Sequence, residues 1–213
     1  MVSKVPGVRS VPMIEVEEVI QLHQTTVRRW HDGEIHNPCQ GVMELICRQH
    51  EQNFRLWHQE DIARSPDAGD AEIAQVKRTI DRLNQQRNDL IEKIDDWLIE
   101  QLAAWGVRPQ PAARLNTETP GSVVDRLSIL SLRIFHMQEQ AARDDADEAH
   151  RQKAFSRLEI LQEQIEDLSV SLVELLEDIL AGRKRLKVYR QFKMYNDPTM
   201  NPHLYAQGRK PAA

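Results

Sequence analysis

The sequence predicts an all-α protein, an antiparallel bundle of about five long helices followed by a short C-terminal helix. Composition favours helix, because only eight of the 213 residues are glycine and 29% are charged. Apolar residues recur every three or four positions over most of the chain, whereas the alternation typical of strands hardly appears. Each helix therefore has an apolar stripe that must be buried, and packing the stripes together gives a bundle.

Two helices are expected at the N-terminal side, at about 14–35 and 41–64. The first carries a stripe of apolar residues at helical spacing, namely Val16, Ile20, Val27 and Trp30. Because the link between the two helices is short, we expect the second helix to run antiparallel to the first. The residues before them, 1–12, contain two prolines and a glycine and are expected to form a flexible arm.

The third helix, at about 70–105, has a heptad seam that is interrupted by Arg87. Its apolar members are Ile73, Val76, Ile80, Leu83, Leu90, Ile94 and Trp97. After a loop, the fourth helix should begin with Thr119 as its N-cap and Pro120 in its first turn. The fourth helix is apolar on nearly all sides, so we expect other helices to surround it.

The fifth helix, at about 147–181, has an uninterrupted heptad seam over 158–179. The seam consists of Leu158, Leu161, Ile165, Leu168, Leu172, Leu175 and Ile179. Such a seam serves an intramolecular bundle or a homo-oligomer equally well. Basic and aromatic residues follow Gly182, and we expect a short helix there. It would complete a single domain at 13–197, with an extended tail at 198–213.

Charge and composition exclude several classes of protein. The net charge of -5 and the isoelectric point near 5.9 argue against nucleic acid or an anionic membrane as a partner. No run of apolar residues is long enough for a membrane span, and no signal peptide is apparent. Two cysteines, Cys39 and Cys47, are too few for a disulfide framework. We therefore expect a cytoplasmic protein.

Some polar residues of the fourth helix must face protein rather than water, so each of these needs a hydrogen-bond or ion-pair partner. On the third helix a polar stripe runs beside the seam, and Arg87 lies within the seam. We expect the Arg87 guanidinium to meet Asp125 or another carboxylate, because an isolated buried charge costs several kcal/mol. The pair could serve a ligand site or only hold the helices in register.

A metal site is a second possibility. His23 and Glu34 recur at the same spacing as His50 and Asp61. If the first two helices are antiparallel, each histidine approaches the carboxylate of the other helix, and two His with two carboxylates can hold a metal. Histidines that are hydrogen-bonded to carboxylates in the core explain the same residues without a metal.

The start of the fourth helix is a third possibility. Its first amides point outward, and Thr119 and Ser122 add hydroxyl groups, so an anion could bind there. The same residues also fit a helix cap with no ligand.

Four blocks of sequence together resemble a bacterial family known as domain of unknown function 4254. The blocks are LWHQEDIARSP, KRTIDRLNQQRNDLIEKID, NTETPGSVVDRLSILSLRIFHM and KVYRQFKMYNDPTMNPHLY. The resemblance implies no activity, and it implies a loose association with gene clusters for cell-envelope polysaccharides. Gly121 stands where the resemblance leads us to expect alanine or another small residue.

The sequence therefore predicts an interhelical polar site, lidded by the basic segment after Gly182, for an anionic small molecule such as a nucleotide-sugar or a sugar phosphate. Whether the protein is an enzyme stays open. Candidate catalytic residues are His58, Asp61, Asp81 and Asp125. Candidate ligand-binding residues are Arg64, Lys77, Arg78, Asn84, Arg87, Asn88, Thr119, Ser122, Arg126, His136, Lys187, Tyr189, Lys193 and Tyr195. The alternatives are a non-catalytic structural bundle and a metal-dependent hydrolase that uses His23, Glu34, His50 and Asp61.

Overall fold

The computed structural model describes residues 14–191, 194 and 197–205, and the expected arm at 1–12 lies outside them. Within this part of the chain the fold is all-α, as expected. The helices are α1 (Val16–Asp32), α2 (Gly41–Ala63), α3 (Asp70–Ala104), α4 (Pro120–Ala141), α5 (Glu148–Leu180) and the short α6 (Pro202–Tyr205). Helices α1, α2, α3 and α5 agree with the expected ranges to within three residues at each end, and α4 begins at the expected Pro120.

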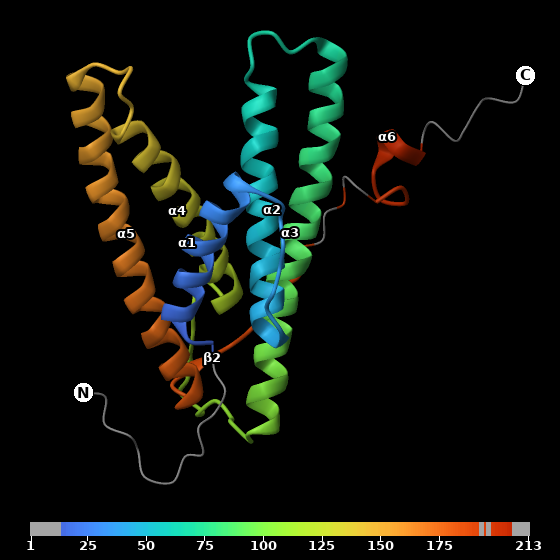
Figure 1. The fold of residues 1–213 in the computed structure, drawn as a ribbon. Coiled ribbons are helices and arrows are strands. Elements are labelled where there is room, and N and C mark those ends of the chain that lie inside the picture. The colour runs from blue at the N-terminus through green and yellow to red at the C-terminus, as the bar shows by residue number, and fades with distance from the viewer. Residues whose placement is uncertain (1–13, 192–193, 195–196, 206–213) are drawn as a thin grey trace, which may run out of the picture.

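The five long helices form a bundle around α4 (Figure 1). Helices α2 and α3 form one antiparallel hairpin, and α4 and α5 form another. Helix α4 contacts α1, α2, α3 and α5, which explains why its sequence is apolar on nearly all sides. Its buried residues lie all around the helix and include the polar Asp125, Ser128 and Ser131.

Helices α1 and α2 run in the same direction, so the expectation of an antiparallel pair is wrong. His23 stacks on His50, and His31 contacts His58, so the pairing advances along both helices together. The cause is the connector at 33–40, which is extended and returns to the start of α2 (Figure 1). Eight extended residues span about 26 Å, and the 17 residues of α1 rise about 25 Å.

Helices α3 and α4 approach each other closely at Gly121. A Cβ atom at this position would lie 2.6 Å from the carbonyl oxygen of Ile91 and 2.9 Å from the Asp95 carboxyl. Glycine is therefore required for this approach, and the alanine expected from the family resemblance would not fit. The start of α4 is otherwise as expected, since Thr119 is the N-cap and its hydroxyl accepts from the Ser122 amide.

The segment after α5 begins as a strand, so the helix expected directly after Gly182 is wrong. Lys184–Arg185 (β2) pairs in parallel with Arg114–Leu115 (β1). From 184 to 189, half-buried and exposed residues alternate, which is the period of a strand. The short C-terminal helix is instead α6.

The heptad seam of α5 lies in the core of the chain itself. Its residues Ile165, Leu172, Leu175 and Ile179 are buried in the main hydrophobic cluster with residues of α1, α3 and α4. Most of the seam is therefore used within one chain. None of the helices among the described residues is long and apolar enough to cross a membrane.

Candidate ligand-binding site

A buried polar network connects α2, α3 and α4. At its centre is the carboxylate of Asp125, which is 4% exposed. Oδ1 of Asp125 accepts hydrogen bonds from the side-chain amides of Gln49 (2.5 Å) and Asn53 (2.9 Å) and from Nε of Arg87 (2.7 Å). The Nη2 of Arg87 donates to Oδ2, which makes the ion pair bidentate. The predicted meeting of Arg87 with Asp125 is therefore present.

The network explains how α4 tolerates a buried acid. Four polar contacts from two neighbouring helices satisfy the carboxylate, so its burial does not leave an isolated charge. The ion pair in turn raises the pKa of the Arg87 guanidinium. The Arg87 side chain is 25% exposed, so it connects the buried carboxylate with the surface.

The network continues inward to two stacked histidines. Ser128 Oγ and His50 Nδ1 share a hydrogen bond of 2.7 Å, and the His50 ring stacks on His23 at 4.5 Å. Burial lowers the pKa of His50 to about 3 and also lowers the pKa of His23. Serine and histidine at this distance resemble a nucleophile and its base, but both are completely buried. Their arrangement is structural, because neither side chain has exposed surface and neither lines any of the clefts described below.

The predicted metal ligands are not brought together. His23 and His50 are in contact, but Glu34 and Asp61 are exposed and the same-direction packing of α1 and α2 removes the expected approach. No group of three or more His, Cys, Asp or Glu side chains in the described part of the chain is placed to hold a metal ion. The arrangement needed by a metal-dependent hydrolase is thus not assembled from these residues.

A groove of about 460 Å³, here called the central groove, opens above the network between α2, α3 and α4. Of the predicted site residues, Asp61, Arg64, Asn84 and Arg87 line it. The other lining residues are Asn53, Leu56, Trp57, Glu60, Ile129, Leu132 and Arg133. Helical spacing explains the α2 contribution, because Trp57, Asp61 and Arg64 lie on one stripe.

A second cleft of about 610 Å³, here called the side cleft, lies between α2, α4 and α5. It shares Trp57, Asp61 and Arg133 with the central groove. His136 also lines it, and its ring stacks on the indole of Trp57. The predicted catalytic candidate His58 lies behind this stack, in contact with His31 and His136. Burial and these two imidazoles lower the pKa of His58.

Arg133 was missed by the sequence analysis. Its side chain lines the central groove and the side cleft, and it has no hydrogen-bond or ion-pair partner among the described residues. By contrast, Arg64 binds Glu60 and Arg87 binds Asp125. The available signal was its position, since Arg133 lies four residues before Met137 and eight after Asp125 on the helix that the other helices surround.

The predicted anion site at the start of α4 is already occupied by the protein. Oδ1 of Asp95 accepts a hydrogen bond of 2.7 Å from the Gly121 amide, so a carboxylate of α3 caps the helix. Burial raises the pKa of Asp95 to about 6, despite hydrogen bonds from Thr119 and Gly121 that lower it. Thr119 and Ser122 hydrogen-bond to each other at this cap and do not line the central groove.

The described part of the segment after α5 does not cover the central groove, contrary to the predicted lid. Its Arg190 binds Glu92 and Asp96 on α3 (3.0 and 2.6 Å), and none of the described residues after Gly182 lines the groove. Lys187 lies over the ring of Tyr189, 4.9 Å from its centre. The predicted ligands Lys193 and Tyr195 lie outside the described residues.

Other predicted residues lie elsewhere. Lys77 and Asp81 form an exposed ion pair on the first half of α3, where Arg78 is also exposed. Asn88 is half-buried and does not line the central groove. Arg126 binds Glu118 at the surface. The polar stripes of the sequence give the faces of these helices but not which of their turns meet.

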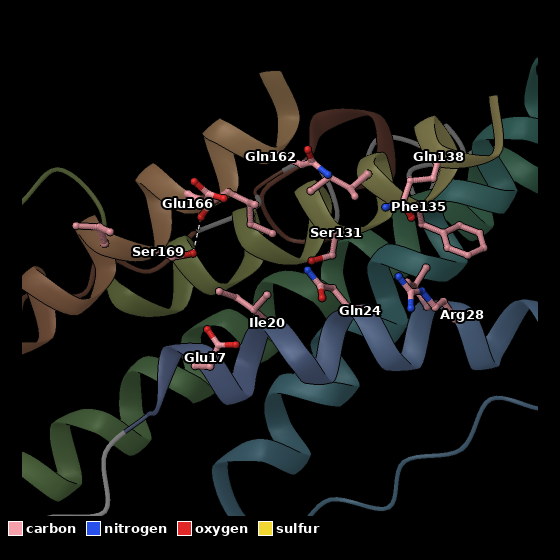
Figure 2. A pocket seen from close by; sticks show the side chains of 14 residues that line it. Glu17, Ile20, Gln24, Arg28, Ser131, Phe135, Gln138, Gln162, Glu166 and Ser169 are labelled. Carbon is pink, nitrogen blue, oxygen red and sulfur yellow. Dashed lines mark hydrogen bonds between the residues drawn. The ribbon is translucent and has the colours of Figure 1, made fainter. Parts of the chain in front are cut away.

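A third cleft, of about 730 Å³, lies between α1, α4 and α5 (Figure 2). Gln24 of α1 points toward Ser131 of α4, and Glu166 projects from α5 (Figure 2). Its charged lining residues, Glu17, Arg28 and Glu166, are exposed, while buried residues such as Val27 lie deeper. No buried ion pair supports this cleft, so we consider the central groove the better candidate site.

Comparison with known proteins gives one family. A family model with the description Protein of unknown function (DUF4254) matches residues 43–188, which is most of the chain. The match includes every residue that lines the central groove. Neither a curated protein nor a solved structure matches the chain.

Proposed function

Since the chain belongs to the family described as Protein of unknown function (DUF4254), and that description states no ligand, we propose a function from the site itself. The protein binds an anionic small molecule, such as a nucleotide-sugar or a sugar phosphate, where the central groove meets the side cleft. The proposal rests on the guanidinium of Arg133, which lines both clefts and has no partner among the described residues. A phosphate or carboxylate would complete its hydrogen bonds.

The buried network supports this proposal. Two N–H groups of Arg87 are bound by Asp125, which fixes the guanidinium at the groove and leaves its other donors for a ligand. Asn84 adds an amide at the same wall. Small-molecule sites are typically concave and contain a small number of polar groups that a satisfied hydrogen-bond network holds in place. The loose association with cell-envelope polysaccharide gene clusters that the resemblance implies is the reason to test nucleotide-sugars and sugar phosphates first.

A thermal-shift screen against nucleotide-sugars, nucleotides, sugar phosphates and inorganic phosphate tests the proposal. At a concentration of about 100 times its dissociation constant, a ligand adds about 2.7 kcal/mol to the free energy of unfolding, which raises the melting temperature by about 5–10 °C. We expect Arg133→Gln to abolish this increase. Arg82→Gln is the matched control, because Arg82 is also exposed and unpartnered among the described residues but lines a different cleft.

Two results would contradict the proposal. Either no anionic compound raises the melting temperature of the unmodified protein, or Arg133→Gln retains the full increase. The first result would favour the alternative of a non-catalytic structural bundle, in which the polar network only holds the helices in register.

A further inference from the structure

The side cleft continues the central groove across α4. Trp57, Asp61 and Arg133 line both, so a ligand bound at Arg133 has access to either side. The remaining lining residues of the side cleft are His136, Met137, Gln140, Arg157, Ile160 and Leu161. Both volumes lie in the range of small-molecule sites. A ligand can therefore have two parts, with its anionic part at Arg133.

An aromatic stack is already built into the side cleft. The rings of Trp57 and His136 are 4.4 Å apart and inclined by only 9°. Nδ1 of His136 is 2.8 Å from the Glu139 carboxylate, and the imidazole also touches His31 and His58. The stack is thus held in place from three helices, and a further planar ring can extend it with little loss of side-chain freedom.

The rest of the cleft suits the faces and edges of an aromatic ring. Met137, Ile160 and Leu161 supply apolar surface, and a methionine thioether packs favourably against aromatic rings. The indole N–H of Trp57 and the guanidinium of Arg157 have no partners among the described residues. Ring nitrogens and carbonyl groups of a heterocycle could accept hydrogen bonds from them.

We infer that the ligand carries a planar aromatic heterocycle which occupies the side cleft while its phosphate lies at Arg133, so that the ligand class is nucleotides. This inference rests on the proposed function. A sugar phosphate would leave the Trp57–His136 stack and the apolar wall unused. An alkyl phosphate would leave the Trp57 N–H and Arg157 without partners. Of these three classes, only a nucleotide uses the stack, the donors and Arg133 together.

Isothermal titration calorimetry with ADP, UDP, ribose 5-phosphate and decyl phosphate tests the inference. We expect at least one nucleotide to bind about tenfold or more tightly than ribose 5-phosphate, because stacking on aromatic side chains contributes that much. Trp57→Leu should lower nucleotide affinity to about the level of ribose 5-phosphate. Arg133→Gln should weaken the binding of both.

A second pair of variants keeps the test valid if Trp57→Leu fails to fold. Ile160 is 54% exposed, so Ile160→Glu places a carboxylate at the wall of the side cleft without disturbing the core. Val170 on the same helix is 59% exposed and lines the third cleft, so Val170→Glu is the matched control. We expect Ile160→Glu to weaken nucleotide binding about tenfold. Val170→Glu should leave it unchanged.

The outcomes separate the inference from the proposed function. If ribose 5-phosphate binds as tightly as the nucleotides, and Arg133→Gln abolishes both, the inference is wrong and the anion site stands. Tighter binding of decyl phosphate than of any nucleotide would assign the side cleft to an alkyl chain and also overturn the inference. If no phosphate compound binds, both the inference and the proposed function fail.

Discussion

The carboxyl group of Asp95 is buried, and its burial disfavours the ionised form. Burial raises its pKa from 3.8 to about 6. Between these two values the folded state holds a proton that the unfolded state releases, so this group stabilises the fold below pH 4 and loses that contribution as the pH rises to about 6. The change is about 1.4 kcal/mol per pH unit.

The substitution Asp95→Asn should remove this dependence. As the pH rises from 4 to 6, we expect the free energy of unfolding of the variant to increase by about 2–3 kcal/mol relative to that of the unmodified protein. The asparagine can still accept the hydrogen bond from Gly121. Urea unfolding at pH 4, 5, 6 and 7 measures the effect, with Asp89→Asn, an exposed position on the same helix, as the control. A constant difference across this range would show that Asp95 is ionised throughout.

His23 has the opposite dependence on pH. Its ring is completely buried, neither nitrogen has a hydrogen-bond partner among the described residues, and burial lowers its pKa. Below pH 6.5 the unfolded state takes up a proton that the folded state excludes, so the free energy of unfolding decreases. His23→Leu should be about 2 kcal/mol more stable at pH 5, relative to the unmodified protein, than it is at pH 7.

Thermal unfolding at pH 7 and pH 5 measures this difference. His36→Leu, at an exposed position in the connector, is the control and should show no such change. Equal effects of His23→Leu at both pH values would mean that His23 is protonated in the folded protein.

At the scale of elements, the ion pair of Arg87 and Asp125 joins the two helical hairpins. We expect Arg87→Leu to destabilise the protein by about 3–5 kcal/mol, because it leaves the Asp125 carboxylate buried without its cationic partner. Adding Asp125→Asn should recover much of the loss. Urea unfolding of the two single variants and the double variant gives the coupling energy. Unchanged stability of Arg87→Leu would show that the amides of Gln49 and Asn53 suffice.

The distance between α3 and α4 depends on Gly121. Gly121→Ala places a methyl group 2.6 Å from the Ile91 carbonyl oxygen, so the two helices must move apart. We expect a loss of about 1–3 kcal/mol in the free energy of unfolding. Gly69→Ala is the control, because no atom lies within 4 Å of the added methyl group. A melting temperature of Gly121→Ala equal to that of the control would contradict the close approach.

The sequence predicted the elements better than their partners. Thr119 and Pro120 locate the start of α4 because a cap depends on neighbouring residues. Arg87 could be paired with Asp125 because a charge within an apolar seam requires a counter-charge. The residues around Asp95 do not indicate that its carboxyl group caps α4 at Gly121, 26 residues further along the chain, because that contact depends on how closely α3 and α4 pack.

At the scale of the whole molecule, the sequence did not predict the direction in which α2 runs or the level at which neighbouring helices cross. The sequence predicts a short link because the first helix is expected to continue to about residue 35. Helix α1 ends at Asp32 instead, and the extended connector at 33–40 is about as long as α1, so α2 runs in the opposite direction to the one expected. The sequence places its candidate ligand-binding residues mainly on α2, α3 and α4, and only some of them line the central groove. A helical stripe gives the face of a side chain but not the level at which a neighbouring helix crosses it.

The packing of α1 has a consequence during synthesis on the ribosome. Helix α1 packs mainly against α4, which begins only at Pro120, while Trp30 also contacts His50 and Phe54 of α2. At typical rates of translation the part of the apolar face that α4 covers therefore stays exposed for on the order of ten seconds after α1 leaves the exit tunnel. During that interval it is an exposed apolar segment that a chaperone can hold until the fourth helix emerges.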